Sequence, residues 1–282
     1  MAFKNLLVHI DDSVASTQRV AAALALAKRQ DAMVTGVAIE LESTISSYIG
    51  VKLPASLTDA QREIVRRAAD DAIDAFTRAA KAAEIRHQTH RIICGAAKAP
   101  ALLSFHARHA DITFMGQPDM REPGAPFYES LLDGVMFASG RPVYIVPYIG
   151  RFDMAHRKAV IAWDGGKKAV RAVNDAIPLL QGRGGEVVVL VINAEERKGA
   201  HGAAPGEDIR AHLARHGNDA RIARETVRDL AIDAAILNYL TDAGADLLIM
   251  GAYSHSRLRE KAFGGVTNAI LHQMTTPVLM AE

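Results

Sequence analysis

The residues of this sequence best suited to chemistry are glycines and a hydroxyl that could hold a phosphate. Residues 264–265 are a glycine pair that opens an apolar, helix-like stretch, and Thr267 follows two positions later. Backbone N–H groups and the helix dipole at such a place favour an anion, and glycine lets the backbone approach it closely. Asp164, followed by two glycines, ends an earlier apolar run. Together these patterns indicate an anion site, although each alone is also typical of a ligand-free turn or helix start.

Other catalytic patterns are missing from the sequence. It holds no GxxxxGK[ST] phosphate loop, no dinucleotide fingerprint after the first strand and no Gly-x-Ser-x-Gly elbow. Kinase, NAD-dependent and hydrolase functions therefore lack their minimal residues. We assign no catalytic residue. A slow ATPase stays open as the enzyme alternative, and its weakness is that Asp164 alone is an obvious candidate for a general base or a Mg²⁺ ligand.

The histidines and the cysteine give no complete metal motif. The pairs His106/His109 and His212/His216 have helical spacings that can bind zinc, but no further ligand pattern accompanies them. The single cysteine, Cys94, excludes both an intramolecular disulfide and a cysteine-based metal cluster. We therefore expect no metal site in the protein itself.

The candidate residues belong to a sequence that repeats itself. Residues 110–116 match residues 245–251, an offset of 135 positions, and a Pro-Val pair recurs at the same offset near the end of each copy. The first strand recurs at an offset of 153 positions, from Asp11 to Asp164. The second copy is therefore 18 residues shorter between these points. We place the loss opposite residues 41–75, where the first copy has a long loop and a longer helix.

Each copy alternates short apolar strands with helix-like stretches rich in alanine. Such alternation predicts a parallel sheet with helices on both faces. We predict an α/β protein of two tandem, open parallel-sheet (Rossmann-like) domains with five strands each, at residues 1–148 and 155–282. Ligands of open parallel sheets bind beyond the carboxyl ends of the strands, and Asp164 and Gly251 would lie at that edge.

On these residues the sequence resembles the universal stress protein family, as a tandem two-domain member with the adenine-nucleotide α-hydrolase-like fold. The resemblance rests on four segments of the second copy: residues 160–165, 247–257, 264–271 and 276–280. ATP-binding members of this family carry glycine, two residues, glycine, nine residues, glycine and then Ser or Thr. Gly251 and Gly264 match the first and third glycines, whereas Ser254 and Gly265 depart from the pattern.

The resemblance implies a site in the second domain for ATP or a related adenine nucleotide, with Mg²⁺ accompanying ATP. Asp164 and the backbone at Val191 would face the ribose and base, and the glycine loop with Arg257 would surround the phosphates. The implied set is Asp164, Val191, Gly251, Ser254, His255, Arg257, Gly264, Gly265, Val266 and Thr267. The implied function is a stress-response regulator. The alternative is a nucleotide-free dimerisation or interaction module of the same fold.

The first copy lacks this loop. At the offset of 135 positions the glycine pair becomes Glu129 and Ser130, and Ser254 becomes Asp119. Two added carboxylates would repel a polyphosphate. We predict that the first domain, with its degenerate site, does not bind ATP and serves as a partner domain.

Charge and hydropathy limit the expected partners. The formal net charge of +1 argues against a nucleic-acid binder, and no stretch approaches the roughly 20 apolar residues of a membrane span. The apolar run at residues 6–10 is too short for a signal-peptide core, so we expect a cytoplasmic protein. The resemblance further implies that the last strands, which begin near Pro142 and Pro277, pair within the chain, while a homodimer of the whole chain stays open.

Overall fold

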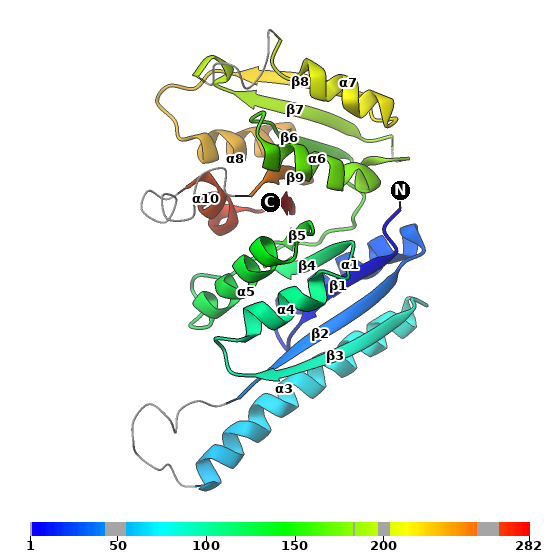
Figure 1. Cartoon of the computed structure of the whole chain (residues 1–282), viewed down its shortest axis with the longest axis vertical. Helices are drawn as coiled ribbons and strands as arrows, with labels where there is room; N and C mark the ends of the chain where they lie inside the picture. Colours follow the sequence, from blue (N-terminus) through cyan, green and yellow to red (C-terminus); the bar gives the residue numbers. More distant parts are fainter. Residues whose placement is uncertain (1, 43–54, 183, 197–203, 253–264) are drawn as a thin grey trace. The chain divides into compact units, whose positions relative to one another are not determined.

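The computed structural model describes residues 2–42, 55–182, 184–196, 204–252 and 265–282 (Figure 1). The chain divides into two compact units. The first unit comprises Ala2–Gly116 and Met120–Arg141, and the second comprises Gln117–Asp119 and Pro142–Glu282. No helix within the described residues is long and apolar enough to cross a bilayer.

The first unit is built on four parallel strands in the order β3-β2-β1-β4. Leu6 of the central strand lies beside Val34 on one side and Ile112 on the other. Strands β1 and β4 are almost entirely buried, as expected where helices cover both faces, whereas β3 alternates between half-buried and exposed positions and is buried only at Ile92 and Cys94. The strands are β1 (Asn5–Ile10), β2 (Met33–Leu41), β3 (His87–Cys94) and β4 (Ile112–Gly116).

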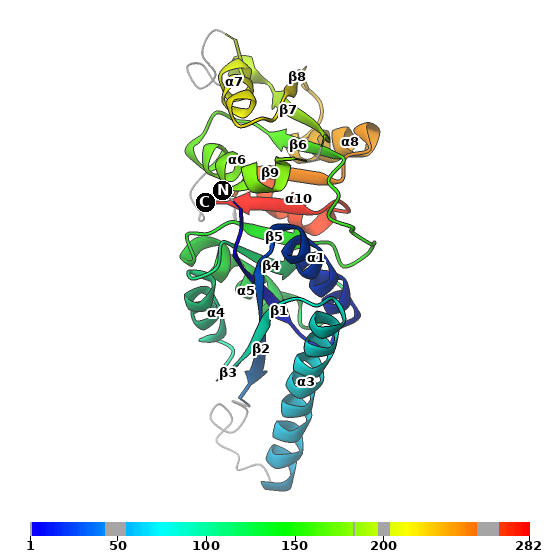
Figure 2. The same cartoon turned by 90° about the vertical axis from the view of Figure 1, so that its right-hand side faces the viewer.

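Helices cover both faces of this sheet (Figure 2). On one face lie α1 (Val14–Gln30) and α3 (Ala55–Ala82), and on the other lie α4 (Ala99–Ala107) and α5 (Ala125–Ala138). Helix α1 begins where the Ser13 side chain accepts a hydrogen bond from the Ser16 amide. Its last turn carries Lys28 and Arg29, which complement the negative end of the helix dipole.

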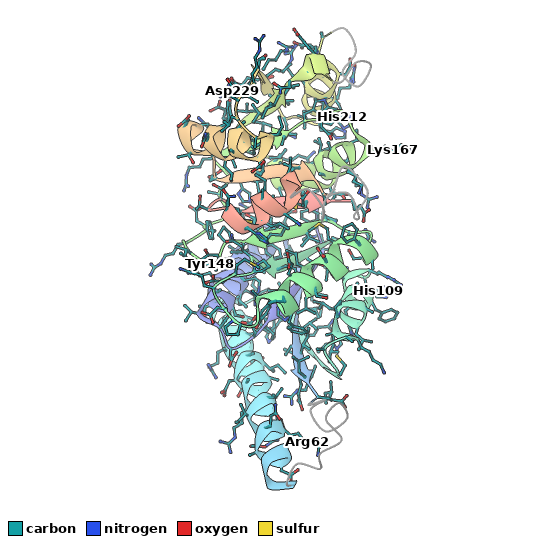
Figure 3. The ribbon with its side chains drawn as sticks, turned by 90° about the vertical axis from the view of Figure 1, so that its left-hand side faces the viewer. Arg62, His109, Tyr148, Lys167, His212 and Asp229 are labelled. Carbon is teal, nitrogen blue, oxygen red and sulfur yellow. The ribbon has the colours of Figure 1, made fainter. Side chains whose placement is uncertain are left out.

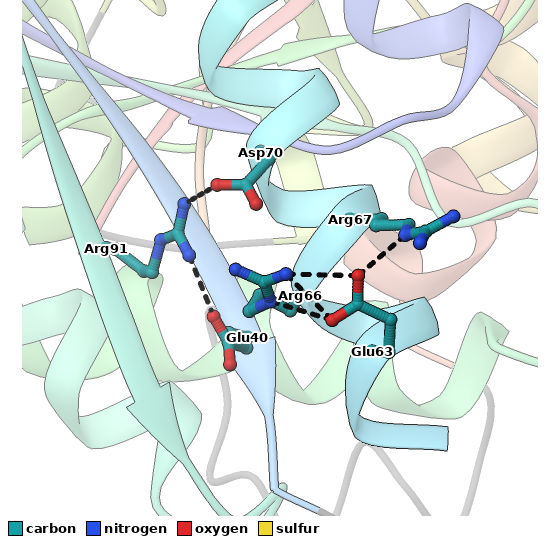
Figure 4. A network of polar contacts seen from close by, with 6 residues as sticks. All are labelled: Glu40, Glu63, Arg66, Arg67, Asp70 and Arg91. Carbon is teal, nitrogen blue, oxygen red and sulfur yellow. Dashed lines mark hydrogen bonds and ion pairs between the residues drawn. The ribbon is translucent and has the colours of Figure 1, made fainter. Parts of the chain in front are cut away.

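An arginine joins the long helix α3 to the sheet (Figure 4). Arg91 of β3 donates to Glu40 of β2 at 3.1 Å and also pairs with Asp70 of α3. Within the helix, Glu63 accepts from Arg66 at 2.8 Å and from Arg67 at 2.7 Å. Because these groups are partly or largely exposed, water screens their attraction, and of these contacts it is the Arg91 pair with Asp70 that joins α3 to the sheet.

The second unit has six strands in the order β5-β10-β9-β6-β7-β8. Neighbouring strands are parallel except for β5 and β10, which are antiparallel, with Ile145 beside Val278. The expected pairing of the last strand of each copy within the chain is therefore confirmed. The strands are β5 (Val143–Val146), β6 (Lys158–Ala162), β7 (Glu186–Ile192), β8 (Ala220–Glu225), β9 (Leu247–Gly251) and β10 (Val278–Ala281).

The helices of the second unit again lie on both faces of its sheet (Figure 2). One face carries α6 (Lys167–Leu180) and α7 (Glu207–Arg215), and the other carries α8 (Ile232–Ala243) and α10 (Val266–Gln273). A 3₁₀ turn, η1 (Ala194–Glu196), follows β7. Helix α8 ends at Gly244, whose φ of 62° is the left-handed conformation that glycine adopts at helix ends without strain.

The predicted α/β architecture is confirmed, with five strands contributed by each copy. The second helix of the first copy, α3, has 28 residues, whereas its counterpart α7 has 9, so the length difference lies where the repeat places it. Strand β5 is grouped with the second unit although it ends the first copy. The boundaries 1–148 and 155–282 therefore stay a proposal that rests on the repeat.

Candidate functional site

The candidate residues of the second copy meet at one edge of its sheet. Strand β6 lies directly beside β9, with Ala162 opposite Met250. The chain connects β6 onward to β7 on one side and reaches β9 on the other, so the strand order reverses between β6 and β9. Asp164 follows β6 and Gly251 ends β9 at the carboxyl ends of these strands. This is the crevice in which open parallel sheets bind ligands.

Asp164 shapes the turn that leads into α6. Its Oδ1 accepts a hydrogen bond from the Gly166 amide at 2.8 Å, and Gly165 between them has a φ of 71°. Gly166 is the N-cap of α6 and supplies no side-chain hydrogen bond. The Asp-Gly-Gly sequence is thus a built turn that fixes the carboxylate and the helix start together. Asp164 is half-buried at this edge of the sheet.

Gly251 is required by packing inside the protein. A Cβ at this position would lie 2.7 Å from the Ala169 backbone nitrogen and 2.7 Å from the Lys168 carbonyl carbon. Real side chains never come so close to backbone, so the first turn of α6 can cross the end of β9 only over a glycine. The sequence pattern places this glycine in a phosphate loop, and the structure adds a second reason for a glycine here.

The start of α10 provides the candidate anion site. Gly265 is the N-cap, with φ −57° and ψ 154° and no capping side chain, and Val266 begins the helix. Thr267 is in the first turn and only 3% exposed, so its hydroxyl is enclosed by the protein. Four other expected residues lie outside the described residues: Ser254, His255, Arg257 and Gly264.

Further candidate residues at this edge of the sheet come from strand β7 and from the start of α6. Val191 is 1% exposed near the end of β7, where its backbone pairs with Arg224 of β8. Sequence reasoning missed two cations here, Lys167 and Lys168, which open α6 directly after the glycine turn. Lys168 pairs with Glu282 at 3.1 Å, while Lys167 is exposed (Figure 3). Their position after Asp-Gly-Gly was a readable signal, because such a turn exposes the first helical residues at the sheet edge.

In the first unit an arginine fills the corresponding crevice. Arg19 of α1 donates from Nε to the His9 carbonyl oxygen at 2.6 Å and from Nη2 to the Asp11 carboxylate at 2.8 Å. A Cβ at Gly116, which ends β4, would collide with Nη1 of the same guanidinium. At the offset of 153 positions Arg19 corresponds to Ala172. The guanidinium therefore occupies space that the second copy leaves to a small side chain.

Burial and the ion pair set the charges of this cluster. Burial, and then the Arg19 charge, lower the pKa of His9 to about 4. Burial alone would raise the pKa of Asp11, but Arg19 and hydrogen bonds from Ser13 outweigh it and lower the pKa to about 2. Burial raises the pKa of Tyr128, whose ring meets His9 edge-on at 6.0 Å, to about 12. At neutral pH the cluster holds a neutral imidazole beside an ionised Asp–Arg pair.

The first copy also differs in where its last helix begins. Helix α5 starts at Ala125 after the N-cap Gly124, whereas the residue that corresponds to the first residue of α10 is Leu131. Glu129 and Ser130, the counterparts of the glycine pair, therefore lie inside a helix and offer no free helix start. The absence of ATP binding by the first copy stays a prediction, and the buried Arg19 and this earlier helix start support it.

The histidine pairs lie away from this edge. His106 is half-buried in the last turn of α4, but His109 lies beyond the last residue of that helix, so the expected placement of both histidines on one helix is wrong. His106 instead meets His90 of β3 at 5.1 Å between ring centroids, and burial, together with His90, lowers its pKa. The ring centroids of His212 and His216 lie 4.7 Å apart at the end of α7. Within the described part of the chain, no group of three or more His, Cys, Asp or Glu residues could hold a metal.

Comparison with known proteins places the second copy in a family. The model of the Universal stress protein family matches residues 155–282. The Universal stress protein Slr1230 of Synechocystis sp. is 43% identical to the chain over 47 residues, which is 17% of this chain and 16% of that protein. The aligned part is thus a small fraction of the relative's length.

Solved structures of similar fold cover nearly the whole chain. A universal stress protein from Archaeoglobus fulgidus DSM 4304 is 16% identical with a TM-score of 0.73, over 99% of this chain and 96% of that one. The functionally unknown protein PA1789 from Pseudomonas aeruginosa PAO1 is 15% identical with a TM-score of 0.61, over 99% and 92%. At these identities the likeness shows the fold alone.

Proposed function

We propose that the second unit, whose residues 155–282 match the model of the universal stress protein family, binds ATP or a related adenine nucleotide as a stress-response regulatory domain. The observation that carries the proposal is the shared edge of β6 and β9, where the strand order reverses. The Asp164 turn and Gly251 both lie there. A glycine-capped helix start follows Gly251 along the chain, at Gly265.

Each part of the site takes a different part of the nucleotide in this proposal. The Asp164 carboxylate accepts from the ribose hydroxyls, and the backbone at Val191 lines the base. The amides at the start of α10, from Gly265 and Val266, hold phosphate oxygens with help from the helix dipole. Thr267 supports this turn from within, because its side chain is enclosed. Ser254, His255, Arg257 and Gly264 complete the phosphate side.

The two lysines at the start of α6 add to this assignment. Lys167 is exposed beside the glycine turn, and a flexible ammonium group there can follow a phosphate without fixing its geometry. Mg²⁺ accompanies ATP in this proposal, held by phosphate oxygens and water, the oxygen ligands that Mg²⁺ prefers. We propose no hydrolysis, because Asp164, the candidate base at this edge, is assigned to the ribose and accepts a hydrogen bond from the Gly166 amide.

The second candidate is a nucleotide-free interaction module. The antiparallel pairing of β5 with β10 favours it, because this pairing ties the end of the first copy to the second unit without any ligand. In that case the protein would bind another protein without a nucleotide. Nucleotide titration separates the two candidates.

The test compares two substitutions at the N-cap of α10. The substitutions are Gly265→Asp and Gly265→Asn. Aspartate and asparagine side chains have nearly the same shape, both suit the observed φ and ψ, and both favour a helix start. Only the aspartate adds a negative charge where the phosphates would bind. We expect calorimetric titration with ATP to show binding by the wild type, binding within about threefold for Gly265→Asn, and a loss of about tenfold or more for Gly265→Asp. Equal affinity of the two variants for ATP would show that the phosphates do not bind at the start of this helix. Absence of ATP binding by the wild type would favour the interaction module.

A further inference from the structure

A buried glutamine from the first copy holds the helix of the candidate phosphate site. Gln117 directly follows β4, is 6% exposed and is grouped with the second unit. Its side-chain Nε2 donates to the Leu271 carbonyl oxygen of α10 at 2.9 Å. Its Oε1 accepts from the Tyr148 amide at 3.3 Å, which fixes the orientation of the side-chain amide.

The Leu271 carbonyl is one that α10 cannot satisfy itself. The last hydrogen bond of the helix runs from the Met274 amide to the Ile270 carbonyl, so the Leu271 carbonyl belongs to the terminal set that needs outside donors. Helix α10 has only eight residues, and a helix of two turns is marginal without tertiary support. Gln117 therefore caps the end of α10 opposite to the one that would face the phosphates.

Comparison of the two copies shows that this bond is an addition to the repeat. At the offset of 135 positions Gln117 corresponds to Ala252. The backbone bond is shared, because the Gln117 amide donates to Val146 and the Ala252 amide donates to Ala281, both at 2.9 Å. Alanine has no side-chain donor, so the second copy makes no matching bond. The repeat thus explains the backbone position, but not the glutamine.

We infer that Gln117 is a positioning residue of the nucleotide site: it anchors the C-terminal end of α10 and so fixes the amides at the other end against the phosphates. The inference rests on the proposed nucleotide function. Because a two-turn helix moves as one piece, loosening one end displaces the other. Residues of the first copy would then set the phosphate affinity of the second copy without touching the ligand.

The test replaces Gln117 by methionine, which has a similar length but no amide. The control is Gln181→Met, because Gln181, although exposed, makes the same kind of bond, from Nε2 to the His216 carbonyl at the end of α7, at 3.2 Å. We expect hydrogen exchange of the α10 amides to rise about fivefold to tenfold in Gln117→Met only, as for a lost hydrogen bond of ordinary strength.

Titrations with ATP and with adenosine separate positioning from general destabilisation. We expect Gln117→Met to weaken ATP binding by about fivefold to tenfold and to leave adenosine binding unchanged, because α10 faces only the phosphates. Equal losses for both ligands, or faster exchange with unchanged ATP affinity, would overturn the positioning role. If the wild type binds neither ligand, the proposed function fails and this inference fails with it. If the wild type binds and Gln117→Met binds equally well, the inference alone fails.

Discussion

Mild acid should destabilise the first unit through His9. This imidazole is 3% exposed, and burial with the neighbouring Arg19 lowers its pKa from 6.5 to about 4. A folded-state pKa below the unfolded value means that the unfolded chain binds the proton more readily. The stability due to His9 is therefore fully present above pH 6.5 and is lost as the pH falls toward 4.

The size of the effect follows from the two pKa values. The linkage relation gives a loss of about 2 kcal/mol between pH 7 and pH 5, and about 3 kcal/mol by pH 4. Asp11 has a pKa lowered from 3.8 to about 2, so it adds a loss of the same sign only below about pH 4. Within this cluster, the loss of stability between pH 6.5 and pH 5 therefore comes from His9.

The perturbation that isolates His9 is His9→Phe. Phenylalanine keeps a ring against Tyr128, whose centroid is 6.0 Å away, and it cannot bind a proton. His9 Nδ1 has no hydrogen-bond partner within the described structure, so replacing it by an apolar ring breaks no hydrogen bond at that atom. The assay is hydrogen exchange of the β1 amides at pH 7 and pH 5, corrected for the intrinsic pH dependence of exchange.

We expect the free energy of opening of β1 to fall by about 2 kcal/mol in the wild type and by much less in His9→Phe. Other histidines with lowered pKa, such as His106 and His212, remain in both proteins and cancel in the comparison. An equal fall in wild type and variant would refute the assignment of the acid response to His9.

Two further substitutions test the two crevices. Arg19→Met leaves Asp11, 13% exposed, without its ion-pair partner and should destabilise the first unit by about 3 kcal/mol in thermal unfolding. Adding Asp11→Asn should recover part of this loss. If the destabilisations of the two single variants simply add in the double variant, the ion pair does not stabilise the unit. Gly251→Ala places a methyl group 2.7 Å from the Ala169 nitrogen and should destabilise the second unit by about 2 kcal/mol. Urea unfolding followed by the fluorescence of Trp163, the one tryptophan, measures that change, and an unaltered midpoint would show that α6 can shift freely.

The sequence predicts the architecture because both copies of the repeat carry the same pattern of strands and helices. The matching runs that end at Gly116 and Gly251 identify the same strand in both copies, and alternation of apolar strands with alanine-rich stretches predicts the parallel sheets. The length difference falls in α3 because an insertion in a helix away from the strand ends leaves the sheet intact. The placement of Asp164 and Gly251 at one edge follows from the same logic, since carboxyl ends of parallel strands share an edge.

The sequence does not predict the contacts made by long side chains across the fold. Arg19 is one basic residue in an amphipathic helix, and only the structure shows its guanidinium over Gly116. Gln117 bonds Leu271 across 154 positions, a distance over which no periodicity carries information. The early start of α5 also escapes the repeat, because Glu129 and Ser130 align with the glycine pair by number while their local helix begins at Ala125.

The most direct test of the nucleotide site in the second unit is the stoichiometry of ATP binding to the full chain by calorimetric titration. We predict one ATP for each chain, bound by the second unit, because Arg19 fills the crevice of the first. Two ATP molecules for each chain would contradict the role given to Arg19 and α5, and none would contradict the nucleotide site itself.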